Sequence, residues 1–231
     1  MSRVLMVVAL LLVGVGPASA ELIERSGTFG GLKVTYKVVL PNGYEAGKPY
    51  PVILVFTGGP QQLQGAQRTL EADWREEAER RGYVVVSPGT PNGSLFFQDA
   101  DRIFPEFLDF LRREYRPAGG RLHVAGHSNG GTSAFHVAAL YPSYFATVTG
   151  YPGLLQGPAA SRAAALKGAC LFMHVGDRDP GWRGAMERQA AELKRDGHRI
   201  AITVEPNQVH RLRAGEIGLS RRLFEQIAGC R

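Results

Sequence analysis

The residues best suited to chemistry form the pattern Gly-x-Ser-x-Gly at positions 126–130, with Ser128 at the centre. A predicted buried strand, Leu122–Ala125, comes directly before the pattern, and a predicted helix, Asn129–Tyr141, begins within it. A strand, tight turn and helix in this order present a serine hydroxyl at the carboxyl end of a sheet, where it can act as a nucleophile. The two glycines fit because side chains at their positions would collide across the turn. The alternative is a glycine-rich turn with an incidental serine.

A serine hydroxyl is a weak nucleophile unless a base removes its proton, and His210 is the predicted base. The other five histidines lie in or beside predicted strands and helices, or directly next to the serine. His210 instead lies in a loop beyond the last predicted strand, Arg199–Val204, and such a loop is where the base belongs in this arrangement. The alternative is a surface histidine without a catalytic role.

An acid that orients the base is expected in the loop after the preceding predicted strand, Ala169–Val175. Two aspartates, Asp177 and Asp179, follow that strand. We favour Asp179 as the acid and expect Asp177 to make hydrogen bonds within the turn, as aspartate commonly does. The order serine, aspartate, histidine leaves room for a helix and a strand between successive members.

Two backbone N–H groups are needed to stabilise the negative oxygen that forms when a serine attacks a carbonyl group. Asn129, directly after the serine, is predicted to supply one. Gly59, in the loop after the predicted strand Val52–Phe56, is predicted to supply the other. Pro60 is excluded because proline has no N–H, and glycine lets the backbone approach a substrate closely. The glycines of this loop could also form a simple turn.

The elements that must position these residues alternate between strands and helices. Leu32–Leu40 alternates apolar and polar residues and predicts a half-buried strand near a sheet edge, whereas Val52–Phe56 is apolar throughout and predicts a buried strand. The alternation predicts one α/β domain with a mostly parallel sheet, helices on both faces and no large lid. The further predicted elements are strands at Tyr83–Val86 and Phe145–Thr149, a helix through Leu70, Trp74 and Ala78 that ends at Gly82, and helices at Phe104–Tyr115, Arg183–Arg195 and Glu216–Ala228.

Residues 1–20 have the features of a secretory signal peptide. Arg3 supplies positive charge, Val4–Val15 is an apolar stretch too short to span a bilayer comfortably, and Ala18-Ser19-Ala20 offers small residues for cleavage. We therefore expect a mature domain of residues 21–231 that is secreted or periplasmic, without stable membrane insertion. The alternative is an uncleaved membrane anchor.

Composition and cysteine content restrict the classes of protein and of binding site that remain possible. The 231 residues are 44% hydrophobic and 21% charged, as in an ordinary globular domain, and the net charge of +6 is spread along the chain. Nucleic-acid binding is not expected, because the sequence has no dense basic run interleaved with aromatic residues. Cys170 and Cys230 predict one disulfide in an oxidising compartment, with two free thiols as the alternative. Neither cysteine has a partner at metal-binding spacing, so no metal site is expected.

Residues 121–131, Arg-Leu-His-Val-Ala-Gly-His-Ser-Asn-Gly-Gly, resemble the nucleophile region of the α/β-hydrolase superfamily. The resemblance is greatest to a secreted esterase branch that includes polyhydroxybutyrate depolymerases, feruloyl esterases and esterase-D-like enzymes. Residues 39–41 and 51–56 resemble its opening strands, and residues 176–179 resemble its acid loop. The resemblance covers nearly all of residues 21–231. It implies a single-domain α/β-hydrolase that cleaves esters through an acyl-serine, without metal or cofactor.

Two segments depart from that branch. Thr57-Gly58 stands where many of its members have His-Gly, so the hydrogen bonds behind this loop are expected to differ. Asn207-Gln208-Val209 precedes His210, where a glycine is often found.

The expected substrate is a carboxylic ester, either a small molecule or a polymer. Four aromatic residues in predicted loops are candidates for lining an acyl or aromatic pocket, with core packing as the alternative: Phe96, Phe97, Tyr151 and Trp182. A peptidase or an acyltransferase with the same three residues is a second possible function. A non-catalytic exported binding protein on a hydrolase scaffold is a third.

Overall fold

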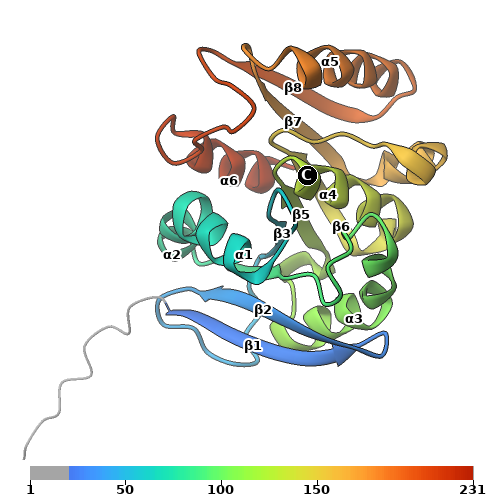
Figure 1. The fold of residues 1–231 in the computed structure, drawn as a ribbon. Coiled ribbons are helices and arrows are strands. Elements are labelled where there is room, and N and C mark those ends of the chain that lie inside the picture. The colour runs from blue at the N-terminus through green and yellow to red at the C-terminus, as the bar shows by residue number, and fades with distance from the viewer. Residues whose placement is uncertain (1–20, 231) are drawn as a thin grey trace, which may run out of the picture.

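A twisted sheet runs through the middle of the molecule, with helices on both of its faces (Figure 1). The computed structural model describes residues 21–230, so the predicted signal peptide at residues 1–20 lies outside the described residues. The strands are β1 (Glu21–Phe29), β2 (Leu32–Leu40), β3 (Val52–Phe56), β4 (Val84–Pro88), β5 (Leu122–Gly126), β6 (Phe145–Gly150), β7 (Cys170–Gly176) and β8 (Arg199–Glu205).

The strand order is β1-β2-β4-β3-β5-β6-β7-β8. β1 pairs antiparallel with β2, and β2 pairs antiparallel with β4, whereas every pair from β4 to β8 is parallel. The carboxyl ends of the parallel strands therefore meet at one edge, which is where side chains on the following loops can converge. The predicted α/β architecture with a mostly parallel sheet is confirmed.

The helices form two layers, one on each face of the sheet. The helices are α1 (Leu63–Thr69), α2 (Arg75–Arg81), α3 (Phe104–Tyr115), α4 (Asn129–Leu140), α5 (Pro180–Arg195) and α6 (Leu219–Gly229), with a π-helical turn η1 (Leu70–Trp74) joining α1 to α2 and shorter 3-10 segments at Asp99–Ile103, Ala118–Gly120, Pro142–Tyr144 and Gly157–Gly168. Apolar residues of α3, α4 and α5 share one buried cluster with the sheet. Those of η1, α2 and α6 share the other.

Strand β3 shows why its residues are apolar without alternation. Val52, Leu54 and Phe56 belong to the cluster on one face, whereas Ile53 and Val55 belong to the cluster on the other. All five side chains are fully buried. A strand covered on both faces has no solvent-facing position, so polar residues are excluded from it.

Two features of the N-terminal half were not predicted. The edge strand β1 pairs with β2 along its whole length, so β2 is the second strand and lies near the edge, as predicted. Most β1 side chains are exposed, which leaves a weak apolar signal in the sequence. The helix predicted through Leu70 begins earlier, at Leu63, and contains the π-helical turn; it ends as predicted at Gly82, which has a left-handed φ of 74°.

A disulfide joins Cys170, the first residue of β7, to Cys230, which follows α6. This confirms the predicted pairing. The cysteines are 60 residues apart, and in the chain-entropy description closing a loop of that length stabilises the folded state by about 4 kcal/mol.

A buried polar cluster joins β7, β8 and α6 further along the strands. On β7, His174 Nδ1 lies 2.9 Å from Glu205 Oε1 of β8, and its Nε2 lies 3.0 Å from Gln226 Oε1 of α6. Arg222 of α6 donates a hydrogen bond of 2.6 Å to Glu205 Oε2. Because buried charges are tolerated when they are paired in this way, the cluster fixes α6 against β7 and β8.

Candidate active site

Ser128 lies on a strained turn between β5 and α4. Its φ and ψ are 57° and −121°, a conformation that non-glycine residues rarely adopt and that costs about 1–3 kcal/mol. A Cβ atom at Gly126 would collide with the carbonyl of Gly130, and one at Gly130 would collide with the carbonyl of Phe56. The turn is held in place by a 2.8 Å hydrogen bond from the Ser128 N–H to the Pro152 carbonyl.

The structure brings His210 and Asp179 together with Ser128. His210 Nε2 lies 2.8 Å from Ser128 Oγ, and His210 Nδ1 lies 2.8 Å from Asp179 Oδ2. The three residues come from loops that follow β8, β7 and β5, so the shared sheet edge explains how distant segments meet. The Asp179 side chain is 9% exposed and that of His210 is 42% exposed. This geometry allows the imidazole to accept the serine proton while the carboxylate orients the ring and stabilises its charged form.

Asp177 makes its main hydrogen bonds to the loop after β8, not only within its own turn as expected. Its Oδ1 accepts a 3.1 Å hydrogen bond from the Gln208 N–H. Backbone N–H groups, that of Asn207 first, lower the pKa of the Asp177 carboxyl. Asp177 therefore joins the loop that carries Asp179 to the loop that carries His210.

The two predicted oxyanion donors belong to loops that are tied together. The side-chain amide of Asn129 donates a 2.9 Å hydrogen bond to the Gly59 carbonyl. Gly59 has a φ of 63°, a conformation open to glycine at little cost. Asn129 is the first residue of α4, where backbone N–H groups have no partner within the helix. The hydrogen bond between Asn129 and Gly59 thus holds the loop after β3 beside Ser128.

Comparison with known proteins agrees with this geometry. A family model for esterases, described as "Putative esterase", matches residues 26–204. The chain belongs to this esterase family. A curated relative, dipeptidyl-peptidase 5 of Porphyromonas gingivalis, is 29% identical over 153 residues, which cover 61% of this chain and 22% of that protein. The chain therefore spans about a fifth of that relative's length.

Solved structures share the fold at low sequence identity. Est1E from Butyrivibrio proteoclasticus has a TM-score of 0.69 at 13% identity, covering 89% of this chain and 99% of that one. A ferulic acid esterase has a TM-score of 0.68 at 18% identity, covering 90% and 96%. These structures show that this esterase-family chain has the α/β-hydrolase fold.

One histidine of the candidate site was not assigned a role from the sequence. His127 Nε2 lies 3.3 Å from the backbone carbonyl of His210, and the two rings lie 5.5 Å apart. Burial, and then the charge of His210, lower the pKa of His127 to about 4, so its ring is neutral near pH 7. His127 therefore contacts the backbone of the His210 loop as a neutral ring. Its place next to the serine was the available signal, but the direction of its ring was not readable from the sequence.

The four candidate pocket aromatics separate into two groups. Phe96 and Tyr151 are fully buried, so the prediction that they line a substrate pocket is corrected: Phe96 packs against Phe56, and Tyr151 accepts a hydrogen bond from Trp74 Nε1. Phe97 is partly exposed. Trp182 is partly exposed as well, and its ring lies 5.4 Å from that of His210, so it borders the reacting groups.

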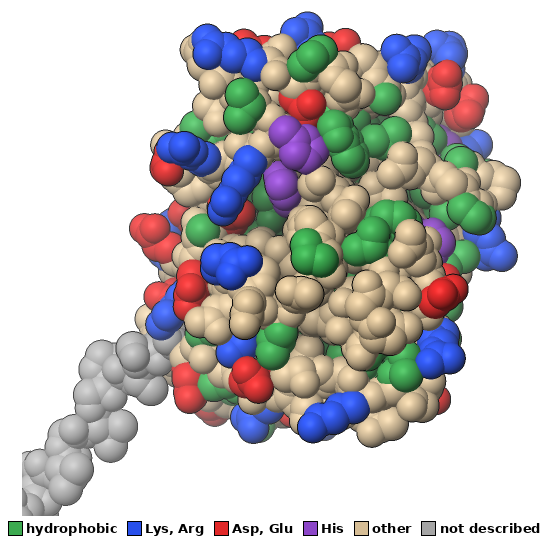
Figure 2. All heavy atoms as spheres, viewed as in Figure 1, with side chains coloured by type: hydrophobic (Ala, Val, Ile, Leu, Met, Phe, Trp, Pro, Cys, Tyr) green, Lys and Arg blue, Asp and Glu red, His purple; other side chains and the backbone are tan. Residues whose placement is uncertain are grey.

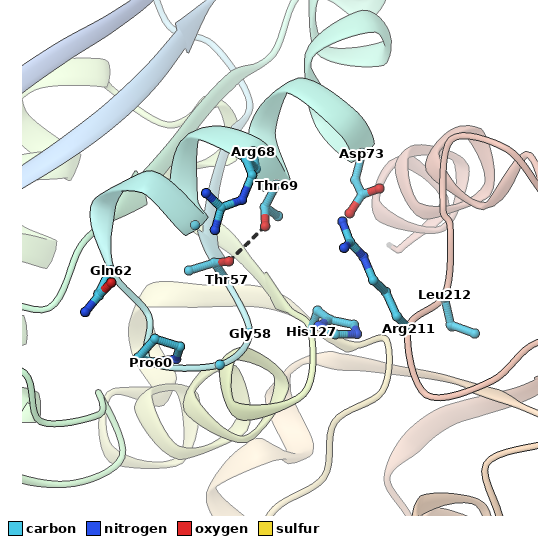
Figure 3. A pocket seen from close by; sticks show the side chains of 12 residues that line it. Thr57, Gly58, Pro60, Gln62, Arg68, Thr69, Asp73, His127, Arg211 and Leu212 are labelled. Atoms are coloured by element: carbon cyan, nitrogen blue, oxygen red, sulfur yellow. Dashed lines mark hydrogen bonds between the residues drawn. The ribbon is translucent and has the colours of Figure 1, made fainter.

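A cavity of about 260 Å³ opens beside Gly59 and His127 (Figure 3). Its other walls come from α1, from η1 and from residues 211–212, and they carry the charged side chains of Arg68, Asp73 and Arg211. On the face with the strand-end loops, Figure 2 shows histidine side chains next to basic ones. The sequence did not indicate this cavity, because its charged residues are far apart along the chain and belong to no common motif.

Within residues 21–230, none of the helices combines the length and the apolar character needed to cross a membrane. The same part of the esterase contains no group of three or more His, Cys, Asp or Glu side chains that could hold a metal ion.

Proposed function

We propose that this hydrolase is an exported serine esterase that cleaves carboxylic esters through an acyl-serine intermediate. The observation that carries the proposal is the hydrogen-bonded series from Ser128 Oγ through the His210 ring to Asp179, with both contacts at 2.8 Å. Residues 21–231 form the catalytic domain in this proposal, and residues 1–20 are removed on export.

Acylation begins when His210 Nε2 takes the proton of the Ser128 hydroxyl and Oγ attacks the ester carbon. The carbonyl oxygen becomes negative and accepts hydrogen bonds from the backbone N–H groups of Gly59 and Asn129. The bond from carbon to the alcohol oxygen then breaks, and His210 gives its proton to the departing alcohol. Asp179 remains ionised throughout and stabilises the imidazolium form of His210.

Deacylation repeats these steps with water. His210 takes a proton from a water molecule as it attacks the acyl-serine, and the same backbone donors stabilise the second tetrahedral intermediate. The carboxylic acid leaves, and the proton returns to Ser128 Oγ. Water thus supplies the group that completes hydrolysis, and the protein ends in its starting state.

A fluorophosphonate probe tests the nucleophile directly. We expect covalent labelling of the wild type at Ser128 and no labelling of Ser128→Ala. We also expect release of 4-nitrophenol from 4-nitrophenyl acetate by the wild type. Equal labelling of the two proteins, or equal turnover by them, would contradict the catalytic proposal and favour a non-catalytic binding protein.

A peptidase is the second candidate, because a curated relative is named dipeptidyl-peptidase 5. The same serine can attack an amide, but the amine leaving group must be protonated more completely by His210. Comparing 4-nitrophenyl acetate with 4-nitroacetanilide and with dipeptidyl 4-nitroanilides separates these functions. Faster cleavage of a dipeptidyl anilide than of the ester would replace the esterase proposal with a peptidase.

The proposed export is supported by the disulfide, since such bonds persist in oxidising compartments. We expect protein recovered from the periplasm or the medium to begin at Glu21 and to contain no free thiol before reduction. N-terminal sequencing and thiol titration measure both. Recovery of the protein inside the cell with Met1 at its N-terminus would contradict export.

A further inference from the structure

The cavity beside the proposed oxyanion donors carries a net positive charge. Arg68 and Arg211 contribute two positive charges and Asp73 contributes one negative charge, which leaves one positive charge when Asp73 is ionised. His127, which faces the same space, is neutral near pH 7 because its pKa is lowered to about 4. Figure 3 shows Arg68 on α1 and Arg211 on the opposite wall, with Arg211 beside Asp73.

Asp73 is placed in this cavity by the π-helical turn η1. The extra residue of such a turn shifts the register of a helix, and π-helical turns often occur at functional sites. Here the turn lets Trp74 point inward, where its Nε1 donates a 2.9 Å hydrogen bond to Tyr151, while Asp73 faces Arg211. Burial raises the pKa of Asp73 to about 6, although Arg211 and the Gly215 N–H oppose this shift. The Asp73 carboxylate therefore interacts electrostatically with Arg211 across the cavity wall.

Arg68 lies at the rim of the cavity with an exposed side chain, and it forms no ion pair with any residue in the part of the chain that the structure describes. The Arg211 side chain is likewise exposed. Behind Arg68, the hydroxyls of Thr57 and Thr69 lie 2.9 Å apart and join the loop after β3 to α1. Both guanidinium groups are therefore available to a ligand, and the contact between Thr57 and Thr69 fixes the part of the cavity wall behind Arg68.

The same cavity adjoins the proposed oxyanion loop and the residue before Ser128, because Gly59 and His127 form part of its wall. A substrate with its ester carbonyl at Gly59 can therefore place a charged end between the two arginines. A guanidinium binds a carboxylate through paired, charge-assisted hydrogen bonds. One net positive charge matches a carboxylate, whereas a doubly charged phosphate would leave negative charge uncompensated.

We infer that Arg68 and Arg211 form a subsite for a carboxylate, so that the preferred substrates are esters carrying a free carboxylate a few bonds from the scissile group. This inference rests on the proposed esterase function, whose substrate class it names. Arg68 and Arg211 are binding residues in this view.

Two matched ester pairs test the inference. In the first pair the charge is on the acyl side: mono-4-nitrophenyl glutarate against 4-nitrophenyl valerate, which has a methyl group in place of the carboxylate. In the second pair it is on the alcohol side: 3-acetoxybenzoate against 3-methylphenyl acetate. We expect wild-type kcat/KM to favour the charged ester in at least one pair, with the difference mainly in KM.

Three variants locate the origin of that preference. Arg68→Gln and Arg211→Gln are each expected to lower the charged-to-neutral ratio by about 10-fold to 100-fold, since a hydrogen bond to a charged group contributes about 1.5–3 kcal/mol. Arg213→Gln is the matched control: it removes the same charge two residues from Arg211, but its side chain is 69% exposed and pairs with Glu216. Its ratio is expected to stay at the wild-type value. Labelling by an uncharged fluorophosphonate verifies that each variant is folded with an assembled site.

Each outcome separates the inference from the proposed function. If the neutral esters are hydrolysed but neither charged ester is preferred, the carboxylate subsite is wrong and the esterase proposal stands. The same conclusion follows if the ratio falls equally in Arg213→Gln, because the effect would then be general electrostatic attraction. If no ester is cleaved and Ser128 is not labelled, both proposals are overturned.

Discussion

Two of the histidine–carboxylate pairs in the described part of the chain are alike in most respects. Asp179 and His210 are 31 residues apart in the chain, and so are His174 and Glu205. In both pairs the histidine Nδ1 lies within 2.9 Å of a carboxylate oxygen, and in both the Nε2 has a third partner. The pair itself is therefore not the mark of a reactive site.

The third partner and the exposure distinguish the two pairs. The Nε2 of His210 faces the Ser128 hydroxyl, and 42% of the His210 side chain is exposed. The Nε2 of His174 faces the Gln226 amide, and only 1% of that side chain is exposed. A substrate can reach the first pair but not the second. The first is suited to proton transfer, and the second to joining β7, β8 and α6.

The largest expected effect separates the two pairs by activity. Replacing Ser128 or His210 with alanine is expected to lower kcat for 4-nitrophenyl acetate by about 10⁴-fold to 10⁶-fold, because the base and the nucleophile work as a unit. His174→Ala is expected to keep kcat within a few-fold in the fraction that remains folded. Single-turnover kinetics with active-site titration measure both. A comparable loss of kcat per folded site in His174→Ala would remove the distinction.

The acids of the loop after β7 provide the next test. Asp179→Asn is expected to lower kcat by about 10⁴-fold, because the ring of His210 loses the carboxylate that fixes its tautomer and stabilises its charge. Asp177→Asn keeps an oxygen for the Gln208 N–H and is expected to change kcat by less than about 10-fold. Steady-state kinetics of the two variants side by side are sufficient. The assignment of Asp179 fails if the two losses are equal.

A smaller effect, on stability alone, is expected at the buried pair. Burial raises the pKa of Glu205, but the contacts with His174 and Arg222 outweigh burial, so its pKa lies below the usual 4.5. Ionised Glu205 therefore stabilises the fold above about pH 4.5, and this stabilisation is lost as the pH falls through the folded-state pKa. Glu205→Gln is expected to lower the free energy of unfolding by about 3 kcal/mol at pH 7.

Urea unfolding at pH 7 and at pH 4 measures this effect. The difference between the wild type and Glu205→Gln is expected to shrink at the lower pH, where the wild-type carboxylate begins to take up a proton. Glu225→Gln, on the exposed side of α6, serves as a control for loss of charge. An unchanged difference at both pH values would show that the charge of Glu205 does not stabilise the fold.

The smallest effect is expected at His127, the other histidine beside the reacting groups. His127→Phe keeps a ring but loses the contact with the His210 carbonyl, so kcat/KM is expected to fall by about 3-fold to 10-fold. His127→Gln retains a donor and is expected to recover part of the loss. Steady-state kinetics for both variants measure it. A loss as large as that of His210→Ala would mean that His127 takes part in proton transfer.

The sequence predicted the framework well where a single physical cause dominates. The bounds of β2, β3 and α3 were predicted correctly, because apolar alternation, a continuous apolar run and helical spacing each follow from burial. The loops of Ser128, Asp179 and His210 were predicted to converge because parallel strands end at one edge. The contacts between these side chains required the structure.

The features that escaped prediction depend on partners far away in the chain. β1 is recognisable as a strand through its pairing with β2, and the cavity exists because α1, η1 and the segment after His210 close around it. Phe96 and Tyr151 lie outside the helices and strands, as predicted, but both side chains are buried in the core. Local pattern does not report such long-range packing.

The cystine between β7 and α6 also decides how the enzyme can be handled. Seven residues of β7, each rising about 3.3 Å, place Cys170 roughly 20 Å from the loop that carries Asp179. An affinity tag, a carrier domain or a solid support fused beyond residue 230 would leave the molecule on the side away from the reacting groups. A protein anchored in this way would keep the candidate active site facing away from the support, so that even an insoluble polymer could reach it.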